Sequence, residues 1–250
     1  MKYLCVAILF LSIGTYNLKS QDLTAKQIIE KANNLTLGRS AKGEMEMTIE
    51  RPSWSRTITM KTWSLGRGYS LIYITAPARD KGQVFLKRET EMWNWMPTVS
   101  RMMKIPSSMM GQSWMGSDFT NDDLVRMNSI VEDYTHKILG EEKINGFECY
   151  KIELMPKEEA AVVWGKLVVW VAKGEYYTMK QENYDEDMML VNIMTASDVK
   201  QMGDRKLPAR LELIPSDKKN QKTIIVTKWQ EFNIDIDESF FSQQNMKQVR

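Results

Sequence analysis

The chain has 250 residues, with 34 lysines and arginines against 32 aspartates and glutamates. Loss of a leader that carries Lys2 and Lys19 would leave 32 basic residues against 32 acidic ones, which removes the electrostatic basis for binding nucleic acid. The remaining chain of about 230 residues is long enough for one β-rich domain with its own core.

The N-terminus has the pattern of an export signal. A single positive charge precedes residues 3–13, which are almost uninterrupted apolar sequence, and a polar stretch follows. An apolar run of about 11 residues is shorter than the roughly 20 that a membrane-spanning helix needs. Residues 1–20 are therefore predicted to be a cleaved signal peptide and residues 21–250 a single exported domain. The alternative is a retained anchor, since Leu18 and Ser20 make a mediocre cleavage site.

The cysteines agree with a soluble exported protein. Cys5 lies inside the apolar run, too early to be the acylated first residue of a mature lipoprotein. Its loss would leave Cys149 alone, so no intramolecular disulfide could form although the compartment is oxidising. The core is therefore expected to hold the fold without covalent help.

The first predicted element of the exported part is an amphipathic helix over residues 25–34. Asp22 or Thr24 can cap it, and Gln27 lies three residues after Thr24, as in a capping box. We expect its apolar stripe to lie on a sheet. The stripe consists of Ala25, Ile28, Ile29, Ala32 and Leu35.

From Gly43 onward the period changes to two. Met45, Met47 and Ile49 alternate with polar residues, which predicts a strand with one buried and one solvated face. Similar strands joined by short turns predict an antiparallel meander of about eleven to twelve strands, and a sheet of that length normally curls. The further strands are predicted at residues 57–64, 69–75, 83–87, 91–96, 133–139, 147–155, 166–171, 177–184, 188–199, 208–214 and 223–232.

One long segment, residues 97–128, interrupts the meander. It contains prolines and glycines and is predicted to form no regular strand. Its last part is predicted to be a short helix, because Thr120 can cap it and two acidic residues follow in the first turn. Residues 237–241 are predicted to form one helical turn that docks its phenylalanines.

Methionine and tryptophan are unusually dense in this segment and in the strand before it. A surface lined by flexible, polarizable methionines can repack around ligands of varied shape, such as disordered acyl chains. The alternatives are ordinary core filling and a thioether Cu(I) site, which adjacent methionine pairs and a single histidine disfavour. The predicted ligand-binding residues are Met92, Trp93, Trp95, Met96, Met102, Met103, Met109, Met110, Trp114 and Met115.

The charged residues give little sign of chemistry. Arg101 and Lys104 are predicted to meet an anionic headgroup at the rim of this site or, alternatively, to be solvated loop cations. His136 lies in a predicted strand and no nucleophile motif can be tied to it. The acids at 141–142 and 185–187 lie in turns and lack the spacing of a Ca²⁺ loop. The sequence therefore predicts no enzyme, no metal site and no cofactor.

Several segments resemble, in order, those of a known family. The most specific is the run 115–124, Met-Gly-Ser-Asp-Phe-Thr-Asn-Asp-Asp-Leu. The opening helix at 25–34, Met-Trp-Asn-Trp-Met-Pro at 92–97, the basic spacing at 101–104 and the closing residues 237–241 accompany it. Over nearly the whole exported part, the chain resembles the LolA-like periplasmic proteins described as outer-membrane lipoprotein-sorting proteins.

This resemblance implies a mainly β fold, a curled antiparallel sheet that forms a half-open barrel capped by short α-helices, as in LolA and LolB. It implies a non-enzymatic, monomeric periplasmic carrier that shields the acyl chains of a lipoprotein or a free lipid in an apolar cavity between the inner and outer membranes. The implied partners are an inner-membrane transporter of the ABC or RND type and an outer-membrane acceptor. The Trp- and Met-rich segment departs from the best-studied sorting carrier, whose functional residues do not map onto this chain.

Two functions from other classes compete with the carrier. The first is an envelope sensor or adaptor that binds a membrane-protein partner through the same fold. The second is an enzyme acting on lipid, which the sequence disfavours because it offers no cluster of titratable residues for a cavity.

Overall fold

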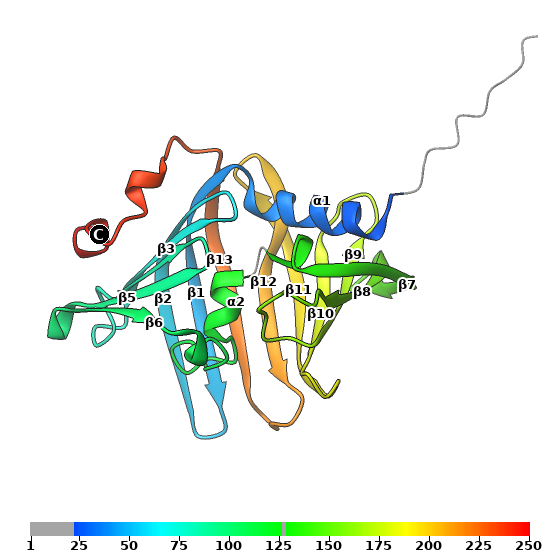
Figure 1. Ribbon diagram of the computed structural model, residues 1–250, viewed down its shortest axis with the longest axis horizontal. Coiled ribbons are helices and arrows are strands. Elements are labelled where there is room, and N and C mark those ends of the chain that lie inside the picture. The colour runs from blue at the N-terminus through cyan, green and yellow to red at the C-terminus, as the bar shows by residue number, and fades with distance from the viewer. Residues whose placement is uncertain (1–22, 127–128) are drawn as a thin grey trace, which may run out of the picture.

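A single curled antiparallel sheet makes up most of the molecule (Figure 1). The structure is a computed structural model that describes residues 23–126 and 129–250, so the predicted signal peptide lies outside the described residues. Thirteen strands lie in the order β6-β5-β4-β3-β2-β1-β13-β12-β11-β10-β9-β8-β7. The strands are β1 (Ser40–Arg51), β2 (Trp54–Leu65), β3 (Tyr69–Ala76), β4 (Val84–Arg88), β5 (Glu91–Met96), β6 (Arg101–Ile105), β7 (Tyr134–Ile144), β8 (Phe147–Pro156), β9 (Lys166–Ala172), β10 (Thr178–Tyr184), β11 (Leu190–Met202), β12 (Arg205–Pro215) and β13 (Lys222–Phe232).

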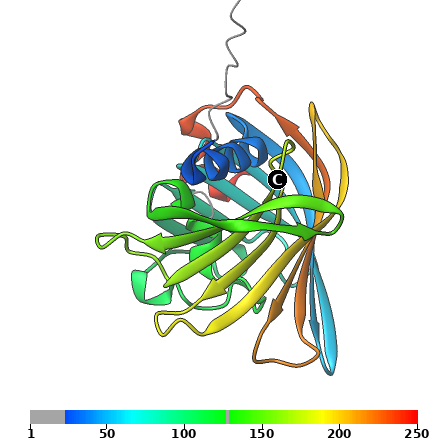
Figure 2. The same cartoon turned by 90° about the vertical axis from the view of Figure 1, so that its right-hand side faces the viewer.

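The strand order joins two meanders at the centre of the sheet. β1 pairs with β13, with Met47 opposite Ile225, so the first six strands run outward to one edge and the last seven run back from the other. The sheet curls without closing, as Figure 2 shows from the side. The predicted mainly β fold, a half-open barrel of antiparallel strands, is confirmed. The chain must therefore pass from edge strand β6 to edge strand β7 across the opening.

The predicted first helix is present as α1 (Ala25–Leu37). Gln27 N donates to Thr24 Oγ1 at 3.3 Å and Thr24 N donates to Gln27 Oε1 at 2.9 Å, which completes the expected capping box. Ile28 and Ile29 are fully buried against residues of β8 and β9. Among the described residues, no helix is long and apolar enough to cross a bilayer.

Strand β6 corrects the expectation that residues 97–128 contain no regular strand. It pairs with β5, with Asn94 opposite Met103 and Trp95 opposite Met102. Its sequence, Arg-Met-Met-Lys-Ile, does not alternate between polar and apolar because each face carries one exposed cation and at least one apolar side chain. Without a period of two, the sequence does not distinguish such a strand from a loop. The short 3-10 helices η1 (Pro97–Val99) and η2 (Ser107–Met109) flank it.

The C-terminal segment, residues 233–250, covers the face of β3–β5 opposite to the one described below as the inner face. It forms the 3-10 helices η4 (Glu238–Phe240) and η5 (Asn245–Lys247). Phe241 is fully buried with Leu71 and Leu86, and its ring meets that of Phe240 at 5.3 Å. The predicted docking of phenylalanines by a closing helical turn is therefore confirmed.

Candidate functional site

The inner face of the sheet is the apolar face that carries α1 and the crossover segment, residues 106–126 (Figure 1). The crossover segment buries Met110, Trp114 and Phe119 against side chains of β1 to β5. The ring of Trp114 meets Phe85 of β4 edge to face at 5.1 Å. The segment therefore fills the β1–β5 part of the inner face with its own side chains, and α1 covers the part over β8 and β9. The other residues of this cluster include Met47, Ile49, Ile58, Met60, Ile74, Met92, Ile105 and Leu213.

The structure divides the predicted ligand-binding residues between the two faces of the sheet. Some of those on the inner face belong to the apolar cluster described above. The others lie on β5 and β6 an even number of positions from the cluster members Met92 and Ile105, so they point to the same face. Cluster members are buried or half-buried, and the crossover segment supplies four of the predicted residues. The inner set consists of Met92, Met96, Met103, Met109, Met110, Trp114 and Met115.

Trp93, Trp95 and Met102 lie on the outer face, where they pack with the C-terminal segment. The reason is strand geometry, because successive residues of a strand point to opposite faces. The structure therefore does not bring these three side chains together with Met92 or Met103. Two surface cavities, of about 480 and about 270 Å³, also lie beside the C-terminal segment and not over the inner face.

The two predicted headgroup contacts also separate. Lys104 lies on the outer face, forms an ion pair with Glu91 and places its Nζ 5.6 Å from the ring centroid of Trp93. Arg101 is exposed at the first position of edge strand β6. It lies two residues before Met103 and therefore points to the same, inner face. Only Arg101 of this pair is placed to reach a ligand on the inner face.

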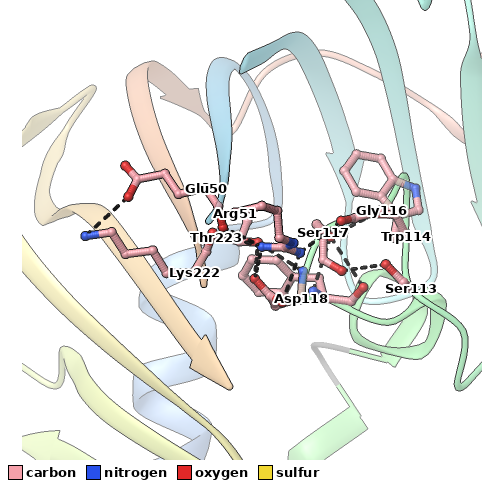
Figure 3. A network of polar contacts seen from close by, with 10 residues as sticks. Glu50, Arg51, Ser113, Trp114, Gly116, Ser117, Asp118, Lys222 and Thr223 are labelled. Atoms are coloured by element: carbon pink, nitrogen blue, oxygen red, sulfur yellow. Dashed lines mark hydrogen bonds and ion pairs between the residues drawn. The ribbon is translucent and has the colours of Figure 1, made fainter. Parts of the chain in front are cut away.

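A buried ion pair joins the crossover segment to the centre of the sheet (Figure 3). Arg51 Nη1 and Nη2 each donate to the Asp118 carboxylate at 3.0 Å, and Nη2 donates to the Gly116 carbonyl at 3.0 Å. The side chain of Arg51 is 12% exposed and that of Asp118 is 6% exposed. Thr223 Oγ1 donates to Asp118 Oδ2 at 2.6 Å and accepts from Asp118 N at 3.0 Å. We call Arg51, Asp118 and Thr223 the latch.

Sequence reasoning missed the latch. The Gly-Ser-Asp-Phe-Thr run was prominent, but Arg51 and Thr223 lie 67 and 105 positions away from Asp118. The one available sign is that Asp118 stands alone as an acid in a Met-rich stretch, where a carboxylate that becomes buried needs a positive partner. Nothing in the sequence selects that partner from the many basic residues of the chain.

The predicted short helix is present as α2 (Asn121–Arg126). Asp123 N donates to Thr120 Oγ1 at 3.0 Å and Thr120 N donates to Asp123 Oδ2 at 2.7 Å, so the expected cap is confirmed. Trp164 Nε1, from the connection between β8 and β9, donates to Asp123 Oδ1 at 2.9 Å. Burial raises the pKa of Asp123, and the hydrogen bonds from Thr120 and Trp164 oppose this shift without cancelling it.

The raised pKa of Asp123 predicts a pH-dependent contribution to stability. Because the pKa is higher in the folded state, the contribution of Asp123 is fully present below its ordinary value of 3.8 and is lost as pH rises through the folded value. Between pH 7 and pH 4, we expect the wild type to gain stability relative to the Asp123→Asn variant. Urea denaturation of both proteins at the two pH values measures this difference. An equal difference at both would contradict the expectation.

Polar atoms without partners lie on the inner face. Among the described residues, Arg56 Nε, Asn94 Oδ1 and Trp114 Nε1 are buried and make no hydrogen bond. The Arg56 guanidinium donates to the Met115 carbonyl, lies 3.9 Å from Asp80, and has a pKa lowered chiefly by burial. Unpaired buried polar atoms are costly, so a ligand offering oxygen acceptors to Arg56 and Trp114 would be stabilised here.

The described residues contain no cluster of metal-ligating side chains. Within residues 23–126 and 129–250, no group of three or more His, Cys, Asp or Glu residues could hold a metal ion. His136 Nε2 lies 2.7 Å from the Ile130 carbonyl, and burial lowers the pKa of the imidazole. Cys149 is a buried free thiol whose pKa is raised by burial. The His136 side chain is thus held against the backbone, and the Cys149 thiol is shielded from solvent.

Comparison with known proteins gives one family and one fold. A comparison with curated proteins finds no match. A solved structure of a DUF1329 family protein from Desulfovibrio piger is 22% identical, with a TM-score of 0.81 and coverage of 89% of this chain and 97% of that one. A structure from Vibrio parahaemolyticus, described as an outer membrane lipoprotein-sorting protein domain, is 25% identical, with a TM-score of 0.79 and coverage of 89% and 98%.

A LolA superfamily protein from Nitrosomonas europaea is 22% identical, with a TM-score of 0.77 and coverage of 90% of this chain and 100% of that one. A family model described as an uncharacterized protein matches residues 66–248. Because that match spans well over half of the sequence, the chain belongs to this family, and its fold is the one found in the LolA superfamily and the lipoprotein-sorting proteins.

Proposed function

We propose that this chain is a non-enzymatic carrier that shields the acyl chains of a lipid or lipoprotein on the inner face of its half-open barrel. The observation that carries the proposal is the crossover segment. It is a mostly irregular, Met-rich segment that spans the opening of the sheet and covers its apolar face. Such a segment can be replaced by a ligand of similar hydrophobicity without breaking any strand pairing. The fold shared with a lipoprotein-sorting protein supports the same function.

The energetics suit reversible binding. Burial of an acyl chain of about 16 carbons contributes a gross gain of about 12 kcal/mol, at about 0.8 kcal/mol per methylene. Moving the crossover segment exposes Met110, Trp114 and Phe119, each worth about 1.5–3 kcal/mol when buried. Together the three side chains lose about 5–9 kcal/mol of burial, so the net gain from cargo is well below the gross gain. A carrier needs this balance, because it must both take up and release its cargo.

An unpaired polar atom on the sheet gives the bound lipid an orientation. Arg56 of β2 offers an N–H donor against the crossover segment, where the carbonyl or anionic oxygens of a lipid can accept. Arg101, exposed at the end of β6, supplies a further charge at the rim. We infer that the headgroup lies toward these donors while the acyl chains occupy the place of the crossover side chains.

This function places the chain in the periplasm as a monomer, after removal of residues 1–20. Its cargo would come from an inner-membrane transporter of the ABC or RND type and go to an outer-membrane acceptor. Support for this route comes from the export pattern of the sequence and from the fold of a lipoprotein-sorting protein. The route is part of the proposal and is tested by identifying the bound lipid.

Two adjacent methionines give a matched test of the inner face. Met103 and Met102 are half-buried neighbours on the same edge strand, but they point to the inner and outer faces respectively. We expect Met103→Gln to raise the Kd for a fluorescent fatty acid about tenfold, because it places an amide in the acyl site, and Met102→Gln to leave it unchanged. Fluorescence titration of the purified full chain measures both.

The same preparation identifies the natural cargo. The protein is purified without detergent, extracted with organic solvent and analysed by mass spectrometry, which should reveal co-purified lipid in the wild type. The consistent absence of lipid, together with no fatty-acid binding, would overturn the carrier function. Equal effects of the two glutamine variants would place the acyl site elsewhere on the molecule.

A further inference from the structure

Two long hairpins project from one end of the sheet. In Figure 1, the β1–β2 and β12–β13 hairpins extend beyond the other turns of the molecule. They are neighbours, because β1 pairs with β13 at the centre of the sheet. The exposed tips are residues 52–55 and 216–220. No strand, helix or C-terminal residue covers them among the described residues.

The tips combine an aromatic side chain with basic residues. Trp54 is 48% exposed at the first tip, among Pro52, Ser53 and Ser55. Lys218 and Lys219 are exposed at the second tip, beside one aspartate. Tryptophan prefers the boundary between water and lipid, because its ring is apolar and its N–H is polar. Lysines near a bilayer are attracted to anionic lipid headgroups.

From this arrangement we propose that the two tips dock the carrier onto a phospholipid membrane that contains anionic lipids, with Trp54 at the lipid–water boundary. This inference rests on the proposed carrier function and names the surface through which the carrier meets a membrane. A protein partner fits the tips less well. A stable protein interface needs about 800 Å² and about 20–30 residues on each side. The tips are two short turns, and together they contain fewer residues than such an interface uses.

The charge around the tips limits how strongly the membrane attracts them. The turn between β10 and β11 carries the acids 185–187, and in Figure 1 it does not reach as far as the two hairpins. Asp217 offsets one of the two lysines at the second tip. Docking therefore depends on insertion of Trp54 as well as on charge, and it is reversible, as delivery of cargo requires.

The docking surface lies directly beside the latch. The Arg51 guanidinium, which holds Asp118 of the crossover segment, lies 5.8 Å from the ring centroid of Trp54. Thr223, the other partner of Asp118, follows the second tip at the start of β13. Movement of Trp54 into lipid would therefore act on the residues that hold the crossover segment closed. This places the opening of the inner face at the membrane, where cargo must enter and leave.

Vesicle flotation with matched tryptophan variants tests the proposal. The full chain is mixed with vesicles of phosphatidylcholine containing about one third phosphatidylglycerol, and bound protein is measured in the floating fraction. We expect Trp54→Ala to reduce binding at least fivefold. Trp229→Ala is the control, because Trp229 is 44% exposed but lies in β13 away from the tips. Circular dichroism verifies that both variants are folded.

Lysine variants separate the contribution of charge to vesicle binding from the contribution of tryptophan insertion. Replacing Lys218 and Lys219 with serine should lower binding to the anionic vesicles by about fivefold for each lysine, and should leave binding to pure phosphatidylcholine vesicles unchanged. Absence of wild-type binding to anionic vesicles, or equal binding by wild type and Trp54→Ala, overturns the proposal and leaves a protein as the occupant of the tips. Fatty-acid titration without vesicles then shows whether the carrier function survives, since that assay does not involve the tips.

Discussion

Replacing Asp118 with alanine is expected to lower the free energy of unfolding by about 3–5 kcal/mol. The variant leaves the Arg51 guanidinium, which is 12% exposed, without the carboxylate that accepts both of its terminal N–H groups. It also removes an acceptor of the Thr223 hydroxyl, and Thr223 is fully buried. A buried charge that loses its partner keeps the full cost of its desolvation, so the effect exceeds that of the hydrogen bonds alone.

The matched control is an exposed ion pair on the same half of the molecule. Glu91 and Lys104 are 47% and 49% exposed, and Glu91→Ala should change stability by less than about 1 kcal/mol. Urea denaturation of wild type, Asp118→Ala and Glu91→Ala gives the three free energies. Similar losses for the two variants would mean that the latch contributes no more than a surface ion pair. The crossover segment would then be held by its apolar contacts alone.

Most of the sheet could be predicted from the sequence because its strands alternate. Met45, Met47 and Ile49 point inward and the residues between them face solvent, so a period of two is visible. Strand β6 is the exception, and its prediction failed for a physical reason. Met103 faces the inner side and Met102 packs under the C-terminal segment, while the exposed Arg101 and Lys104 also lie on opposite faces, so neither face is uniformly polar or apolar. A sequence pattern without a period of two does not predict a strand.

The division of the Met- and Trp-rich residues between two faces was within reach of the sequence. Residues 91–96 were predicted to be a strand, and strand alternation alone separates Trp93 and Trp95 from Met92 and Met96. The high density of methionine and tryptophan suggested that these residues share one surface. The alternation of side chains along a strand already required that they lie on two surfaces. What covers the outer face, the segment that buries Phe241, could not be inferred, because it comes from the far end of the chain.

The latch and the filled inner face were beyond sequence reasoning. Arg51 ends one strand and Thr223 begins another, and only the β1–β13 pairing at the centre of the sheet brings them to the same place. That pairing joins the two ends of the chain and leaves no local sign. A half-open barrel could equally have contained an empty cavity. The crossover side chains that fill it make movement of this segment the central question for function.

Holding the crossover segment in place should abolish binding of acyl chains. In an Asp118→Cys/Thr223→Cys variant, the two side chains replace a pair already joined by a hydrogen bond of 2.6 Å, so a disulfide can form without large backbone movement. We expect the oxidised variant to bind a fluorescent fatty acid at least tenfold more weakly than the same protein after reduction. The comparison keeps the sequence constant, so loss of the Arg51 ion pair affects both states equally.

Single-cysteine variants under the same oxidant control for disulfides to other thiols. Cys149 is fully buried, so Asp118→Cys and Thr223→Cys alone should bind fatty acid equally with and without oxidant. If the oxidised double variant bound as tightly as its reduced form, the crossover segment would not need to leave the sheet near Asp118. Cargo would then enter from another part of the opening, such as the α1 end. A strong loss in the oxidised double variant alone would show that the segment must move for cargo to reach the inner face.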